Sequence, residues 1–148
     1  MPTNIRLVDS SGADFYPTPP WATHALAEQE PFSRQIWEPA CGDGAISNVL
    51  TARGHNVFSS DLYDRGFGVA GENFLRTDRT SDNIIANPPY NLAEQFVQAG
   101  IAKARNKFAL LLRLAFFESA SRATSIFLKT PPTRVWVFSE RITFYPQG

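Results

Sequence analysis

Four consecutive residues, Asn87-Pro88-Pro89-Tyr90, place an amide, two rigid prolines and an aromatic ring directly after an apolar run. Proline fixes its own φ near −65° and biases the preceding residue toward extended conformations. The Asn87 side chain and the Pro88 carbonyl are therefore held in one arrangement, and each presents an oxygen that accepts hydrogen bonds without a change in protonation. Two such acceptors suit an amino group with two hydrogens, and Tyr90 offers a flat face for a planar substrate.

The chemistry that this pattern favours is substitution at a weakly nucleophilic nitrogen. The lone pair of an exocyclic or amide nitrogen is delocalised, so the free group reacts poorly. Two fixed acceptors can hold its hydrogens so that the lone pair points at an electrophile, and they stabilise the positive charge that develops as the bond forms. We therefore interpret Asn87, Pro88, Pro89 and Tyr90 as catalytic candidates that need no basic residue at the outset.

A glycine turn and an acid earlier in the chain indicate a nucleoside site. Gly42 and Gly44, in "EPACGDGAIS", permit a tight turn and the close approach of a ligand to the backbone. Asp61 ends the next predicted strand, where an acid can bind ribose hydroxyls. The glycine pair alone fits an ordinary turn equally well, and Asp61 alone fits a turn cap.

Strands that alternate with helices must position these residues. The sequence predicts helices over 21–30, 46–54, 92–106 and 119–130, and strands over 35–40, 55–62, 83–87, 107–117 and 133–140. Thr18 reads as the N-cap of the first helix, and 107–117 as a strand covered on both faces. Residues 63–83 read mainly as loop. This order predicts an α/β fold with a doubly wound, mostly parallel sheet, helices on both faces, and ligands beyond the carboxyl ends of the strands.

Length and composition favour one folded domain over residues 1–148, without a separate target-recognition domain. No segment has the pattern of a membrane span or a signal peptide, and the single cysteine agrees with a reducing compartment. His24 and His55 show no pattern that indicates a metal site. Residues 1–102 hold 6 Lys+Arg against 12 Asp+Glu, and 103–148 hold 8 against 2. The basic third fits either phosphate binding or ordinary solvated charges.

Together, "FYPTPP", "EPACGDG" and "NPPY" resemble the motif set of S-adenosylmethionine-dependent adenine-N6 DNA methyltransferases, especially short phage-type or prophage-type members. The resemblance covers roughly Asp14 to Pro146. It implies a Rossmann-like methyltransferase sheet, S-adenosylmethionine as cofactor, DNA as partner, and methyl transfer to the N6 amine of an adenine flipped out of the duplex. It also implies the cytoplasm of a bacterium or phage-infected cell as the location.

The resemblance assigns roles to individual residues. The implied cofactor-binding residues are Phe15, Tyr16, Thr18, Pro19, Glu38, Ala40, Cys41, Gly42, Gly44, Asp61, Asn73 and Phe74. Asn73 replaces the family's aspartate, from which we expect weaker or altered cofactor binding. The implied substrate-binding residues are Tyr90, Phe144, Arg113 and Phe117, although the last three also fit structural roles. No metal is implied. The segment around Thr18 fits either closure over the cofactor or an N-terminal arm.

The resemblance leaves other functions open. We expect the chain, as a short form or a fragment, to lack the antiparallel strand that normally completes this sheet. An open sheet edge would invite self-association or a partner subunit. The same acceptor pair also suits a glutamine-N5 protein methyltransferase or an RNA adenine-N6 methyltransferase. A non-catalytic relative that binds cofactor or nucleic acid is a further alternative.

Overall fold

The computed structural model describes residues 15–144. Its strands are β1 (Ile36–Glu38), β2 (Val57–Asp61), β3 (Val69–Ala70), β4 (Ser81–Ala86) and β5 (Ala104–Leu110). Its helices are α1 (Pro20–Gln29), α2 (Ala45–Ala52), α3 (Ala93–Lys103) and α4 (Ala120–Arg122), the last continuing into a π-helical turn over Ala123–Phe127. Short 3₁₀ turns span Tyr90–Leu92 and Leu114–Phe117. Within this described range, every helix is too short or too polar to cross a lipid bilayer.

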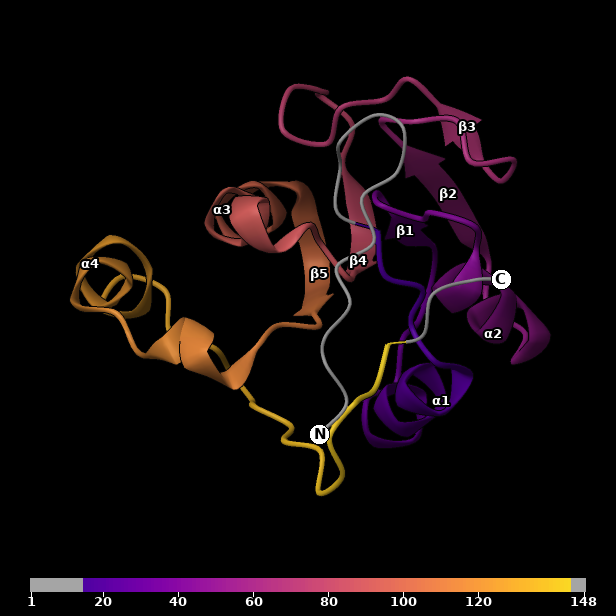
Figure 1. The fold of residues 1–148 in the computed structure, drawn as a ribbon. Coiled ribbons are helices and arrows are strands. Elements are labelled where there is room, and N and C mark those ends of the chain that lie inside the picture. The colour runs from indigo at the N-terminus through magenta and orange to yellow at the C-terminus, as the bar shows by residue number, and fades with distance from the viewer. Residues whose placement is uncertain (1–14, 145–148) are drawn as a thin grey trace.

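The strands form one sheet in the order β3-β2-β1-β4-β5, and every pairing in it is parallel (Figure 1). Strand β1 lies at the centre, with Ile36 opposite Val57 on one side and Asn83 on the other. The chain order reverses between β1 and β4, which is where open α/β sheets bind ligands. The predicted doubly wound parallel sheet is therefore confirmed.

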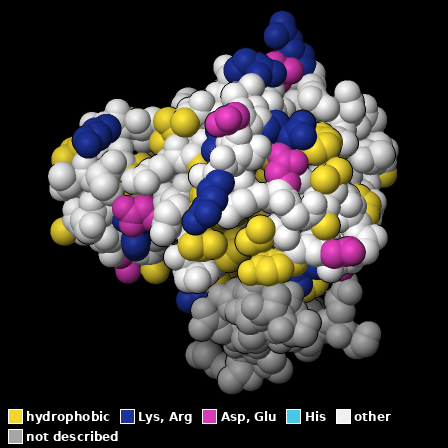
Figure 2. Space-filling view, turned by 90° about the horizontal axis from the view of Figure 1, so that it is seen from above, with side chains coloured by type: hydrophobic (Ala, Val, Ile, Leu, Met, Phe, Trp, Pro, Cys, Tyr) yellow, Lys and Arg dark blue, Asp and Glu magenta, His cyan; other side chains and the backbone are white. Residues whose placement is uncertain are grey.

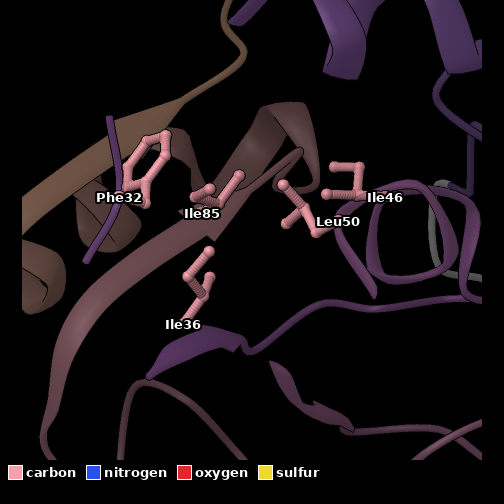
Figure 3. Packing of buried hydrophobic residues seen from close by; sticks show 5 residues of the cluster. All are labelled: Phe32, Ile36, Ile46, Leu50 and Ile85. Carbon is pink, nitrogen blue, oxygen red and sulfur yellow. The ribbon is translucent and has the colours of Figure 1, made fainter. Parts of the chain in front are cut away.

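Alternating residues of the central strands face two hydrophobic cores. Ile36 and Ile85 point toward α2, where they pack with Phe32, Ile46 and Leu50 (Figure 3). The opposite face carries the neighbouring strand residues and packs against α3 through a second cluster: Trp37, Phe74, Ile84, Ala86 and Phe96. The helices α1 and α2 thus lie on one side of the sheet and α3 on the other (Figure 1).

Gly100 in α3 lies directly against the Phe108 ring of β5, and a Cβ at this position would overlap that ring. Helix propensity alone predicts that Gly100→Ala gains about 1 kcal/mol. Overpacking against an aromatic ring costs about 1–3 kcal/mol, so we expect a net loss of stability of up to about 2 kcal/mol. Urea unfolding measures the difference. Adding Phe108→Leu should recover part of it, and a stabilised Gly100→Ala variant would contradict this packing.

Several predicted boundaries and elements differ from the structure. The predicted helix over 92–106 ends at Lys103, and the predicted strand over 107–117 begins earlier and ends at Leu110. Strand β5 is the last strand of the sheet and is only half-buried, so it is not covered on both faces. Residues 111–117 instead leave the sheet, and Phe116 packs against Ala93 and Val97 of α3. The two-residue β3, within the predicted loop, was missed.

Residues 133–140 form no strand, which makes that prediction wrong within the described part of the chain. Side chains hold this segment against α1. Arg134 donates to both oxygens of Glu30, and Trp136 Nε1 donates to Oε1 at 2.9 Å. The ring of Phe138 contacts that of Trp21 edge-to-face at 5.2 Å. In place of sheet pairing, a carboxylate and an aromatic contact therefore anchor the segment, and β5 remains the edge of an unclosed sheet.

Candidate functional site

A cavity of about 430 Å³ lies beyond the carboxyl ends of three adjacent strands, in the size range of small-molecule sites. Glu38 ends β1, Asp61 ends β2 and Asn87 follows β4, and all three residues line it. Because β1 pairs with both β2 and β4, the parallel register brings these three strand ends together. The cavity therefore spans the switch point of the sheet.

The cavity wall contains most of the residues singled out from the sequence. Predicted site residues on the wall are Phe15, Tyr16, Thr18, Glu38, Ala40, Cys41, Asp61, Asn73, Phe74, Asn87, Pro88 and Pro89. Residues from the N-terminal segment, the glycine turn and the Asn-Pro-Pro corner are thus gathered around one space. Outside the wall lie Pro19, Gly42, Gly44, Tyr90, Arg113, Phe117 and Phe144.

The amide of Asn87 has a defined orientation. Its Nδ2 donates to the carbonyl oxygen of Tyr16 and to Oγ1 of Thr18, each at 3.1 Å. A carbonyl oxygen can only accept, so the nitrogen must face it, and both amide hydrogens are used. Oδ1 is then the acceptor that this side chain can offer to a ligand. Thr18 is not the N-cap of α1, because Pro19 occupies that position without a side-chain cap.

Aromatic side chains surround the Tyr90 ring just outside the cavity wall. Tyr16 stacks on it with ring centroids 5.6 Å apart and an interplanar angle of 30°, and Phe144 meets Tyr16 edge-on at 5.6 Å. The Arg113 guanidinium carbon lies 4.5 Å from the centre of the Tyr90 ring. Three of the four predicted substrate-binding residues are therefore close together. The fourth, Phe117, is 41% exposed and packs on Phe127 instead.

The glycine turn is shaped by packing as well as by the cavity. Gly42 has φ +55°, and a Cβ there would overlap the ring of Phe15. Its N–H donates to Asp61 Oδ2 at 2.9 Å, while Oδ1 of the same carboxylate accepts from the N–H of Tyr63 at 2.9 Å. Asp61 therefore ties the glycine turn to the loop after β2. Each carboxylate oxygen has further acceptor capacity for a ligand hydroxyl.

The Asn73-Phe74 pair contributes to the cavity and to the core together. Asn73 Oδ1 accepts from the N–H of Leu75 at 3.0 Å, which forms a local side-chain turn. The Phe74 ring is buried and packs edge-to-face on Trp37 at 5.2 Å and against Phe96 at 4.9 Å. A turn at Phe74 and Leu75 therefore places apolar side chains on the cavity wall.

Glu38 is an acid buried at the base of the cavity, with 1% of its surface exposed. Burial raises its pKa well above the ordinary value of 4.5, and the nearby Asp61 and Asp43 raise it further. A hydrogen bond from Ser47 Oγ to Oε2, at 3.3 Å, opposes the rise only in part. The folded protein therefore retains a proton at Glu38 that the unfolded chain has already lost above pH 4.5.

Glu38→Gln should flatten the dependence of stability on pH. In the wild type, the folded state binds more protons than the unfolded chain above pH 4.5, so the free energy of unfolding falls as the pH rises toward the raised pKa. Glutamine cannot ionise and can still accept from Ser47. In the variant, the free energy of unfolding should no longer decrease in this way as the pH rises. Urea unfolding at several pH values measures this. The exposed Glu118→Gln should keep it, and equal slopes in wild type and Glu38→Gln would contradict the buried acid.

Part of the wall was not predicted from the sequence, including residues in the loops that follow β2 and β3. The additional lining residues include Asp43, Tyr63, Arg65, Glu72 and Leu75. The Arg65 guanidinium carbon lies 4.4 Å from the Phe15 ring centre and 5.5 Å from that of Tyr63. Their position just after a strand could have identified some of these wall residues, because residues that directly follow a parallel strand lie at the ligand edge of the sheet.

Comparison with solved structures supports the fold. A glycopeptide N-methyltransferase, MtfA, complexed with S-adenosylmethionine matches 70% of this chain and 58% of its own with a TM-score of 0.51 and 14% identity. A putative RNA methyltransferase, PH1948 from Pyrococcus horikoshii, matches 66% of this chain and 57% of its own with a TM-score of 0.50 and 15% identity. The chain thus spans less than three fifths of either structure. No protein-family model and no curated protein matches it. At these identities, the shared property is the Rossmann-like methyltransferase fold.

Proposed function

We propose that this protein is an S-adenosylmethionine-dependent methyltransferase that acts on the exocyclic N6 amine of adenine in DNA. The observation that carries the proposal is the orientation of Asn87. Both hydrogens of its amide nitrogen are held by the N-terminal segment, which leaves Oδ1 to accept at the cavity. An acceptor fixed in this way suits the hydrogens of a substrate amino group.

The groups on the cavity wall fit the proposed cofactor. S-adenosylmethionine carries an ammonium group, a sulfonium group and one carboxylate on a nucleoside. Besides the protonated Glu38, the wall offers the acids Asp43, Asp61 and Glu72 together with Arg65. Acids near the two cationic groups and a guanidinium near the carboxylate would complement this charge distribution. The apolar wall formed by Phe74 suits the flat adenine ring.

The residues of the chain would act by binding and orientation. When bound, S-adenosylmethionine would supply an electrophilic methyl group on a sulfonium, and the demethylated cofactor, a neutral thioether, would be the leaving group. Asn87 Oδ1 and the Pro88 carbonyl would accept the two hydrogens of the substrate nitrogen and direct its lone pair into the cavity. The substrate nitrogen becomes acidic as the bond forms, so its proton can pass to water. Tyr90 would stack on the adenine, which requires the ring of Tyr16 to move aside.

The basic C-terminal third gives the DNA assignment little support. Three of its eight cationic side chains pair with acids: Arg105 with Asp82, and Lys107 and Arg134 with Glu30. On the face seen in Figure 2, Lys and Arg are interspersed with Asp and Glu instead of forming one basic field. Methyl transfer to DNA rests on the resemblance of "NPPY" and "FYPTPP", and substrate choice must be measured directly.

A labelled-methyl assay tests the proposal. The protein is incubated with S-adenosylmethionine that carries a radiolabelled methyl group and with separate pools of duplex DNA, single-stranded DNA, structured RNA and protein. We expect label in DNA, released as N6-methyladenine after hydrolysis to nucleosides. Label in RNA or on glutamine would contradict DNA as the substrate and would still support methyl transfer to nitrogen. Cofactor binding without transfer to any pool would favour a non-catalytic relative.

A further inference from the structure

We propose that Thr18 is a positioning residue for Asn87 and not a cofactor contact, an inference that rests on the proposed function. The N-terminal strap, defined here as residues 15–18, crosses the cavity wall. Its Thr18 hydroxyl and Tyr16 carbonyl are the two acceptors of the Asn87 amide nitrogen. In this view the strap sets the direction in which the amide oxygen points.

The two acceptors act together to prevent rotation of the amide. A half-turn about the terminal side-chain bond would place Oδ1 against the Tyr16 carbonyl, where two acceptors repel and no hydrogen bond forms. With Tyr16 alone, one amide hydrogen would be unbound and the plane of the amide could tilt. Thr18 Oγ1 accepts the second amide hydrogen, with an Nδ2–Oγ1 distance of 3.1 Å, and this fixes the plane of the Asn87 amide. Catalysis by orientation depends on such fixed geometry.

The strap is itself held in place, so its acceptors can impose a direction. Thr18 is 5% exposed. The Phe15 ring fills the space beside Gly42 and lies under the Arg65 guanidinium at 4.4 Å. The Tyr16 ring stacks on Tyr90 until the adenine displaces it, and the Phe15 contacts hold the strap after that. Phe15 and Tyr16 therefore contact different parts of the cavity rim.

Other roles for the Thr18 hydroxyl are less consistent with its contacts. Helix capping is excluded by Pro19, which is the N-cap of α1. The hydroxyl oxygen accepts from Asn87, and its own hydrogen can still donate, so the Kd for S-adenosylmethionine is the quantity that separates positioning from cofactor contact. The positioning role requires an acceptor oxygen at the place of Thr18 Oγ1.

Two substitutions separate these roles. Thr18→Val keeps the shape and removes the acceptor, and Thr18→Ser keeps the acceptor. We expect Thr18→Val to lower kcat about tenfold, the effect of losing one hydrogen bond, with the Kd for S-adenosylmethionine changed by less than about twofold. Thr18→Ser should recover most of kcat. The control is Thr23→Val, which removes a buried hydroxyl from α1 and should leave kcat unchanged.

A second readout makes the test independent of turnover. The side-chain amide resonances of Asn87, identified by their loss in Asn87→Ala, should shift in Thr18→Val and stay in place in Thr18→Ser and Thr23→Val. A raised Kd with normal kcat, equal losses in the valine and serine variants, or unmoved amide resonances in Thr18→Val would each overturn the role of Thr18. A wild-type chain that binds no S-adenosylmethionine would instead overturn the proposed function.

Discussion

Replacing Asn87 by alanine should lower the rate of methyl transfer by about 10²–10³-fold, the usual effect of losing one group that stabilises charge in a transition state. The amide oxygen should bind the substrate nitrogen most strongly as positive charge develops, so the loss should fall on kcat. The Kd for S-adenosylmethionine should change by less than about threefold, because Asp61 and Glu38 line the cavity independently of Asn87. Single-turnover rates and equilibrium dialysis measure the two quantities.

A matched control is Asn48→Ala, which removes an exposed asparagine side chain from α2. It should leave both quantities unchanged. Asn87→Ala also frees the strap, so the melting temperature of each variant is needed to separate lost chemistry from lost folding. Near-normal turnover in a folded Asn87→Ala protein would remove the basis of the proposed mechanism.

Replacing Glu30 by glutamine should lower the free energy of unfolding by about 2 kcal/mol. Removing one partner of a fully buried ion pair costs about 3–5 kcal/mol, and exposed pairs contribute at most about 1 kcal/mol. The Glu30 side chain is 9% exposed, but Lys107 is 25% and Arg134 47% exposed, which places this cluster between the two limits. Urea unfolding of the variant measures the loss.

The stabilisation should depend on pH with a defined sign. Hydrogen bonds from Arg134 and Lys107 lower the pKa of Glu30 from 4.5 to about 2. The contribution of the folded pair is therefore complete above pH 4.5 and is lost as the pH falls through about 2. The difference between wild type and Glu30→Gln should shrink over this interval. Glu28→Gln, an exposed change on the same helix, should show no such difference. A constant difference between pH 5 and pH 2 would argue against the cluster.

Where the reasoning was local, the sequence predicted residues that line one cavity in the structure. Asp61 ends a strand, Asn87 and the glycine turn each follow one, and parallel strands that pair must bring their carboxyl ends to one edge. This rule predicts a ligand site beyond the carboxyl ends of the strands, where the cavity lies. It could not determine the orientation of the Asn87 amide, which depends on a carbonyl 71 positions away.

The C-terminal third was predicted less well, for a physical reason. An apolar run such as "KFALLLRLAFF" can form a buried strand, and it can equally form a segment that packs on α3. Its composition therefore does not indicate where β5 ends. The alternation in "RVWVF" has the period of a strand. In the structure this segment forms no strand. It is held by Glu30, more than 100 positions earlier, whose carboxylate binds Arg134 and Trp136. Such long-range pairing leaves no periodic signal.

The separation between Glu30 and Arg134 has a consequence for synthesis on the ribosome. All five strands have been translated once Leu110 is added, 24 residues before Arg134 (134 − 110). At about 5–20 residues per second, the nascent sheet exists for roughly 1–5 seconds before its last clamp can form. During that interval Glu30 can pair with Lys107 but not yet with Arg134, so its carboxylate binds β5 before it binds the C-terminal segment.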